Sequence, residues 1–237
     1  MIKYYDSTVF NTPAHTLVNT VNCFGVMGAG IALEFKLRYP EMYEEYKQRC
    51  DKKEYKIGRP RLYKSSEKWV LNFPTKNHWR YPSKIEWIEE GLKYFALNYK
   101  KAGIESIAFP KLGTNNGGLE WTDVKKIMEK YLGNLDIDVY ICLDDKKEAE
   151  GIEFLMVEEI NKINIDRLIK DIKLTKKQAE TVVKSLPVKR FWTLSKAKGV
   201  GEKTYEKIFS YFYNRFTEKS ESINNNDIDL EQITFFS

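Results

Sequence analysis

Residues 17–32 read Leu17-Val18-Asn19-Thr20-Val21-Asn22-Cys23-Phe24-Gly25-Val26-Met27-Gly28-Ala29-Gly30-Ile31-Ala32. A short apolar run ends in two asparagines and is followed by three glycines and an apolar-periodic segment. This order predicts a strand, a glycine-rich loop and a helix. Glycines let the backbone adopt positive φ and approach a ligand closely, and the N–H groups that open the predicted helix 31–38 favour negative charge. The stretch therefore predicts an anion-binding loop.

A second segment repeats this pattern, and it reads Phe109-Pro110-Lys111-Leu112-Gly113-Thr114-Asn115-Asn116-Gly117-Gly118-Leu119-Glu120-Trp121. One glycine-rich loop is weak evidence, because such loops also serve as plain connections between a strand and a helix. The first loop lacks the Lys and Ser/Thr of a P-loop, and its asparagines depart from the Rossmann pattern. Two glycine-rich loops at the carboxyl ends of strands in one sheet could hold a pyrophosphate from both sides.

A third segment, residues 74–83, leaves a predicted strand with the composition of a loop but carries Lys76, His78, Trp79 and Arg80. Loops held by a scaffold often carry reactive groups. Ser83 and Glu86 have the spacing of a capping box for the next helix, which would fix the loop at its far end. The plain alternative is that the two cations are solvated and that the tryptophan packs on this helix.

The composition excludes several classes of protein. A chain of 237 residues with 42% hydrophobic content can bury a sizeable core. No apolar run reaches the length of a membrane span and no signal pattern opens the chain, so we expect a cytoplasmic protein without a membrane partner. Three cysteines without C-x-x-C spacing and two histidines argue against a disulfide framework and a metal site. We expect no metal and no cofactor.

The positive charge is concentrated in one part of the chain. Residues 160–217 contain 14 Lys or Arg and 5 Asp or Glu, whereas residues 218–237 contain 1 and 5. From Ile152 onward the periodicity is helical. We therefore predict a domain over 1–150, a basic helical domain over 151–217 and a flexible acidic tail over 218–237.

The basic domain contains a candidate contact with DNA. Residues 194–208 resemble a helix-hairpin-helix motif, whose turn offers backbone amides to a phosphate. The predicted DNA-binding residues are Gly199, Val200, Gly201 and Lys203. Tyr205 stands where the motif usually has a small residue, and an ordinary turn between two helices is the alternative interpretation.

Together, the Asn-Thr-Val-Asn loop, the segment Asn72–Arg80 and the Pro-Lys-Leu-Gly loop resemble the macrodomain, an ADP-ribose-binding fold, and specifically the DarG type. The resemblance covers roughly residues 1–145. It implies an α/β fold, a three-layer α/β/α sandwich with a mixed sheet, here followed by a small all-helical C-terminal domain. DarG proteins are antitoxins that remove ADP-ribose from thymidine bases in DNA and so reverse the DarT toxin. ADP-ribosylated DNA and a DarT-like toxin are the implied partners.

The resemblance also assigns roles to residues. It implies that Lys76 attacks C1 of the distal ribose, and we expect Lys76 and His78 to be the catalytic residues. Burial or a positive neighbour, with His78 and Arg80 as candidates, must keep the Lys76 amine neutral. Many macrodomains have an adenine-contacting aspartate at the position of Thr8, so we expect the backbone at Thr8 and Val9 to make that contact. The ligand-binding residues expected in full are Thr8, Val9, Asn19, Asn22, Gly25, Val26, Met27, Gly28, Gly30, Ile31, Gly113, Thr114, Asn115, Asn116, Gly117, Gly118 and Leu119.

Three assignments stay open at this point. Asn22 is expected to hold the distal ribose or the modified base, whereas Asn19 could equally belong to the loop's own hydrogen bonding. Cys23 could be a nucleophile, but no histidine or acid is placed by sequence to activate it, which favours a buried thiol. The function could be that of a hydrolase, a non-catalytic ADP-ribose reader, or a DNA-binding reader module with a degenerate macrodomain.

Overall fold

The computed structural model describes the backbone of residues 1–224 and the side chains of residues 1–217. The chain divides into two compact units between Lys146 and Lys147, four residues before the boundary we predicted. The last helix, α8 (Glu202–Asn224), continues past residue 218, where we predicted that the tail begins. The sequence from 202 to 224 has no glycine or proline to end the helix there. The remainder of the predicted tail, 225–237, lies outside the described residues.

The first unit is built on one six-stranded sheet in the order β1-β6-β5-β2-β4-β3. All neighbouring strands are parallel except β3 and β4, which form an antiparallel pair. The predicted mixed sheet is thus confirmed. The strands are β1 (Ile2–Tyr5), β2 (Thr16–Asn22), β3 (Arg61–Tyr63), β4 (Trp69–Lys76), β5 (Ser106–Pro110) and β6 (Asp138–Cys142).

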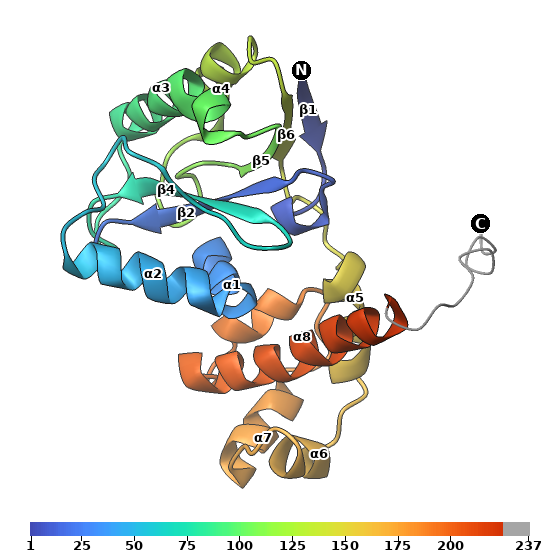
Figure 1. Ribbon diagram of the computed structural model, residues 1–237. Coiled ribbons are helices and arrows are strands. Elements are labelled where there is room, and N and C mark those ends of the chain that lie inside the picture. Colours follow the sequence, from blue (N-terminus) through green and yellow to red (C-terminus); the bar gives the residue numbers. More distant parts are fainter. Residues whose placement is uncertain (225–237) are drawn as a thin grey trace. The chain divides into compact units, whose positions relative to one another are not determined.

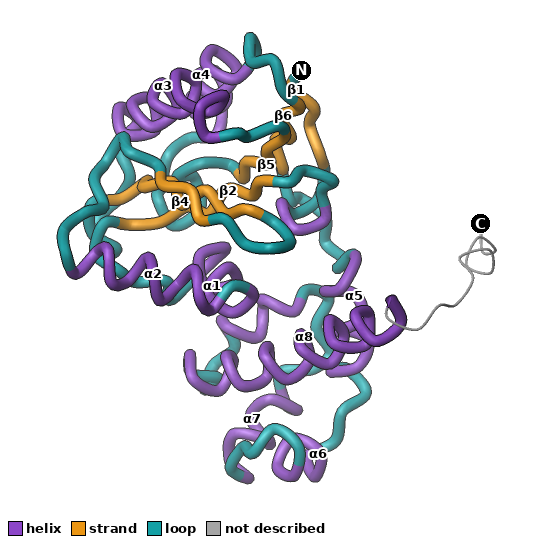
Figure 2. The backbone as a smooth tube through the Cα atoms, viewed as in Figure 1, coloured by secondary structure: helices purple, strands orange, loops and turns teal. Residues whose placement is uncertain are grey.

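Helices cover both faces of this sheet, as Figures 1 and 2 show. One face carries α3 (Ile85–Ala102) and α4 (Trp121–Leu132), and the other carries α1 (Gly30–Arg38) and α2 (Pro40–Asp51). Alternate strand residues supply the two cores: Ile107 and Phe109 pack with α3 and α4, while Ala108 packs with α1 and α2. This period of two is what a sheet buried on both faces requires.

Strand β4 runs to Lys76, three residues farther than its apolar run predicts. Pro74 lacks an N–H group, but β3 pairs with β4 only from Val70 to Asn72, so no ladder bond to β3 is lost. Opposite the end of β2, the register moves from Val21–Pro74 to Asn22–Lys76, which makes Thr75 the extra residue of a bulge. A bulge re-aims the side chain that follows it, and here that side chain is Lys76.

The second unit is helical, with α5 (Gly151–Ile160), α6 (Ile165–Lys170), α7 (Lys176–Lys184), a 3₁₀ helix η2 (Phe191–Lys196) and α8. Helix α7 begins with a capping box between Thr175 and Gln178. Among the residues that the structure describes, no helix has the length and apolar character needed to cross a membrane.

A partly enclosed ion pair links α5 to the segment before η2. The Glu153 carboxylate accepts hydrogen bonds from Arg190 Nε at 3.1 and 3.0 Å and from the Phe191 N–H group at 2.8 Å. The side chains of Arg190 and Glu153 are only 8% and 11% exposed. Because both charges are largely removed from water, either one alone would be costly.

We expect Glu153→Ala to lower the free energy of unfolding of the second unit by about 3–5 kcal/mol, the usual cost of removing one partner from a buried pair. Hydrogen exchange of the amides in α8 up to residue 216 would measure the effect in this unit alone. Glu148→Ala is the matched control, because Glu148 pairs with Lys189 at 2.6 Å in an exposed position. It should cost less than about 1 kcal/mol. Equal effects of the two substitutions would contradict the prediction.

Candidate functional site

Three loops at the carboxyl edge of the sheet meet in the first unit. They are the β2 loop (residues 23–29), the β4 loop (77–84) and the β5 loop (111–120), each named for the strand it follows. A Cβ placed on Gly30, at the end of the β2 loop, would lie 2.7 Å from Nδ2 of Asn116 in the β5 loop. The two glycine-rich loops therefore face each other in direct contact, as two sides of one site require.

The Lys76 side chain reaches this junction from the end of β4. Its Nζ donates to the carbonyl oxygen of Asn116 and, at 3.4 Å, to that of Trp79. Burial lowers the pKa of the Lys76 amine below its ordinary value. Of the two causes that we left open, burial or a positive neighbour such as His78 or Arg80, desolvation by burial is the one that lowers this pKa. A partly buried amine with a lowered pKa is a suitable nucleophile.

The glycines of both loops have structural reasons for their positions. Gly25, Gly30, Gly113 and Gly118 adopt positive φ, whereas Gly28 does not. A side chain at Gly117 would overlap the Gly113 carbonyl oxygen, so the β5 loop can close only with glycine there. The loop is further held by hydrogen bonds from the N–H groups of Gly118 to Thr114 O (2.9 Å) and of Leu119 to Gly113 O (3.0 Å). The loop has the compact, backbone-rich form that suits a phosphate.

Asn22 organises the β2 loop from within. Its Oδ1 accepts hydrogen bonds from the N–H groups of Phe24 (2.9 Å) and Val26 (3.4 Å), and its Nδ2 donates to Val26 O at 2.6 Å. Tyr46 Oη adds a bond of 2.7 Å to Asn22 O. Both ends of the amide are used by the loop, so Asn22 shapes the loop, and its contact with the distal ribose or the modified base stays a prediction.

Asn19 lies farther from the carboxyl edge and is fully buried. Its Nδ2 donates to Asn72 Oδ1 on β4 at 2.9 Å and lies 3.7 Å from the sulfur of Met27, which is also buried. The internal hydrogen bonding that we left open for Asn19 is what the structure contains. Asn19 and Met27 were both predicted to bind ligand. In the structure both side chains are buried and pack under the backbone of the β2 loop.

Some of the other predicted ligand-binding residues are buried, and some are exposed. Val9 lies in the 3₁₀ helix η1 (Val9–Asn11) with its side chain in the core, so only its backbone could contact a ligand. Thr8 caps this helix and is partly exposed. Ile31 lies in the first turn of α1 and packs against the core, while Asn115 and Asn116 are exposed in the β5 loop.

His78 lies at the centre of an aromatic group. Its ring centroid lies 4.4 Å from that of Phe24, 5.7 Å from that of Trp79 and 5.4 Å from that of Tyr81. Its Nδ1 accepts a hydrogen bond from the Arg80 N–H group at 3.2 Å. Sequence reasoning did not connect Phe24 to this group, although a large aromatic side chain inside a glycine-rich loop was a visible signal.

Ser83 holds the end of the β4 loop, though not as the predicted helix cap. Helix α3 begins at Ile85 with Lys84 as its N-cap, and no side chain caps it. Instead, the Ser83 N–H group donates to Gly117 O at 2.9 Å, and the serine is buried. Because the Ser83 N–H group is bonded to the β5 loop, it is not available to the Glu86 side chain, and the predicted capping box does not form.

The Cys23 thiol is partly buried, and burial raises its pKa to about 11. A thiol with such a pKa carries little thiolate at neutral pH. The structure favours the interpretation of Cys23 as a small packed residue over that of a nucleophile.

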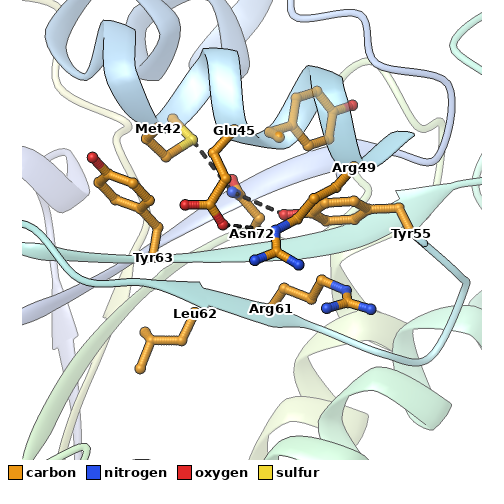
Figure 3. A pocket seen from close by; sticks show the side chains of 9 residues that line it. Met42, Glu45, Arg49, Tyr55, Arg61, Leu62, Tyr63 and Asn72 are labelled. Atoms are coloured by element: carbon orange, nitrogen blue, oxygen red, sulfur yellow. Dashed lines mark hydrogen bonds and ion pairs between the residues drawn. The ribbon is translucent and has the colours of Figure 1, made fainter. Parts of the chain in front are cut away.

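A cavity of about 130 Å³ lies on another part of the first unit, between α2 and β3 (Figure 3). Asn72 closes its inner end through bonds from Nδ2 to Tyr55 Oη (3.2 Å) and Met42 Sδ (3.3 Å). Asn72 is four residues before Lys76, roughly 13 Å along the strand. No residue of the three loops lines this cavity, which is therefore separate from the junction at Asn116. Its lining residues are Met42, Glu45, Tyr46, Arg49, Tyr55, Arg61, Leu62, Tyr63 and Asn72.

The predicted DNA-binding turn of the second unit precedes α8. Gly199 adopts a φ of +89°, Val200 is buried, and a Cβ on Gly201 would have no atom within 4 Å. The element before the turn is the 3₁₀ helix η2, which differs from the first α-helix of the expected motif. Lys203 is exposed in the first turn of α8.

Comparisons with known proteins agree with this geometry. The model of the Macro domain family matches residues 18–128. The solved structure of the macrodomain of Mycobacterium tuberculosis DarG is 42% identical and has a TM-score of 0.59, covering 60% of this chain and 97% of that chain. The chain belongs to the macrodomain family. The predicted resemblance to the DarG type is confirmed as well.

Two further relatives are informative. A Mycobacterium tuberculosis DNA ADP-ribosyl glycohydrolase is 40% identical over 162 residues, which are 65% of this chain and 46% of the relative. The structure of Thermosipho africanus DarTG in complex with ADP-ribose is 38% identical with a TM-score of 0.59, covering 65% of this chain and 44% of that one. The chain thus spans less than half the length of the DNA ADP-ribosyl glycohydrolases that it matches.

Proposed function

We propose that the macrodomain of this protein removes ADP-ribose from a thymine base in DNA and so reverses the modification made by a DarT-like toxin. The observation that carries the proposal is the position of Lys76, whose Nζ lies against the glycine-rich β5 loop at Asn116. The similarity to a DNA ADP-ribosyl glycohydrolase and to a DarTG protein that binds ADP-ribose supports the substrate.

In this proposal the two glycine-rich loops hold the diphosphate and present C1 of the distal ribose to Lys76. The neutral amine attacks C1, a C1–Nζ bond forms and the C1–N bond to the base breaks. The proton that the amine loses goes to the departing base nitrogen. The ribose ring of this adduct then opens to an imine as the second proton of the amine passes to the ring oxygen. Water hydrolyses the imine, which releases ADP-ribose and regenerates the amine.

The second unit would bring the substrate to this site. Its excess of Lys and Arg over residues 160–217 supports contact with DNA phosphates, and the Gly199–Gly201 turn is the proposed point of contact. The alternative partner for this surface is the toxin itself.

A non-catalytic ADP-ribose reader is the second candidate function, because the two loops alone would suffice for binding. Lys76 separates the two candidates. A reader has no need of an amine with a lowered pKa at this position, whereas a hydrolase of the proposed type depends on it.

We expect Lys76→Ala to slow the release of ADP-ribose from an oligonucleotide modified on thymine by at least about 100-fold, the scale of losing one catalytic group. Lys76→Arg should be equally impaired, because arginine keeps the charge but cannot give up its proton. Release would be followed by chromatography, with a guanine-modified oligonucleotide in parallel to identify the base. A borohydride-type reductant should trap wild-type protein on the substrate and leave Lys76→Ala unmodified.

Two results would contradict the assignment. Wild-type rates in Lys76→Ala would exclude the amine from the reaction. Substantial activity in Lys76→Arg would mean that the residue acts through its charge and not as a nucleophile.

The pH dependence follows from the same amine. Below its pKa Lys76 is protonated and cannot attack, so kcat/KM should rise with pH through a pKa lower than the ordinary 10.5. The profile of kcat should be displaced to higher pH, because bound phosphates stabilise the ammonium form. A kcat/KM that is flat or falls with pH over the alkaline range would argue against a lysine nucleophile.

Gly118→Glu tests the phosphate site separately from the chemistry. A side chain at Gly118 would enter open space, so a carboxylate there should repel the diphosphate without disturbing the loop's packing. Gly118→Gln is the control, because it has the same length and the same strain at a φ of +76° but no charge. Calorimetry should find ADP-ribose affinity at least about tenfold lower for Glu than for Gln. Equal affinities would place the diphosphate elsewhere.

A further inference from the structure

An exposed group of aromatic side chains lies beside the proposed catalytic lysine. We call Phe24 of the β2 loop with His78, Trp79 and Tyr81 of the β4 loop the aromatic platform. Phe24, Trp79 and Tyr81 are 57%, 42% and 64% exposed. Exposed rings gathered in this way are uncommon on a protein surface and often mark a binding site.

Hydrogen bonds fix the platform relative to Lys76. The Cys23 N–H group donates to Lys76 O at 3.0 Å and to Asn77 O at 3.3 Å, which joins the β2 loop to the start of the β4 loop. Trp79 O accepts from Lys76 Nζ at 3.4 Å. A molecule that presents its modified sugar to Lys76 would therefore pass over these rings.

The surroundings of the rings are cationic. The Arg80 guanidinium lies 4.8 Å from the Trp79 ring centroid, and Lys84 Nζ lies 5.3 Å from that of Trp87. Residues 76–85 contain no Asp or Glu. Exposed rings interspersed with cations suit a polyanion with accessible flat faces, which describes a nucleic acid strand with unpaired bases.

We propose that the aromatic platform stacks the bases that flank the modified nucleotide and so forms a second binding site for single-stranded DNA. The inference rests on the proposed function for its substrate but concerns a separate surface. Paired bases in a duplex hide their faces, so the platform selects unpaired DNA. Stacking does not depend on hydrogen-bond patterns, so the site tolerates any flanking sequence.

Two substrates separate the platform from the ADP-ribose site. One is a single-stranded oligonucleotide of about ten nucleotides with one ADP-ribosylated thymine, within the usual size range of single-strand sites. The other is ADP-ribosyl-thymidine alone, which has no flanking bases. Tyr81→Ala and Phe24→Ala should each raise KM for the oligonucleotide about tenfold, the usual effect of one lost stacking partner, and change the nucleoside kinetics little.

Three control variants test the physical cause. Tyr81→Phe keeps the ring and should restore the oligonucleotide KM. Tyr4→Ala removes a ring that is 43% exposed on β1, at the far end of the sheet order from β4, and should have no effect. Arg80→Ala should weaken oligonucleotide binding and reduce its salt dependence.

The outcomes distinguish failure of the inference from failure of the proposed function. Equal losses on both substrates in Tyr81→Ala would mean that the ring only supports the loop, and no loss on either would exclude stacking. If the wild-type protein released ADP-ribose from neither substrate, the proposed function would fail. Fluorescence anisotropy of an unmodified single strand would still test the platform through the same variants. Equal losses of affinity for that strand and for its duplex in Tyr81→Ala would overturn the inference.

Discussion

The packing around Asn116 is the constraint on which the site depends. Parallel strands place the loops that follow them at one edge of the sheet, but contact between these loops requires that no side chain stands between them. Gly30 meets the Asn116 amide so closely that even a methyl group would displace it, and Gly117 lies against the Gly113 carbonyl group. Lys76 completes the junction through the Asn116 carbonyl oxygen. The Lys76 amine and the two glycine-rich loops thus lie together at the carboxyl edge of the sheet.

Local features of β4 determine the direction in which the Lys76 side chain points. Thr75 forms the bulge, and Pro74 is tolerated because β3 no longer pairs at that level. On the far side of the β4 loop, the Ser83 N–H group binds Gly117 O. The β4 loop is therefore attached at both ends to the loops that it must act with. This attachment explains how the loop that follows Lys76 keeps a defined position beside the proposed nucleophile without a helix cap.

Sequence patterns predicted the strands, the helices and the two glycine-rich loops, because a period of two or 3.6 and the turn residues are local signals. They did not predict which polar side chains serve the loops themselves. Asn22 binds its own loop and Tyr46, a residue 24 positions away, and its expected contact with the ligand stays a prediction. Ser83 had the spacing of a helix cap, but its N–H group binds Gly117 O, and sequence alone could not decide between burial and a charged neighbour as the cause that lowers the pKa of Lys76. Each difference arises from tertiary contacts that neighbours in sequence cannot reveal.

The chemistry and the aromatic platform are connected through one conflict. In the proposed reaction the lysine nucleophile must be neutral, but a diphosphate bound by the two loops would favour the ammonium form, as do the carbonyl oxygens of Asn116 and Trp79. Tighter binding of the ADP-ribose moiety would bring more negative charge toward the amine and make this conflict worse. Binding energy obtained from flanking bases on uncharged rings adds affinity without adding charge at the amine, and it can be used to position the sugar. A substrate that also stacked on Phe24 and Tyr81 would need less binding energy from its phosphates. Burial could then keep the pKa of Lys76 low.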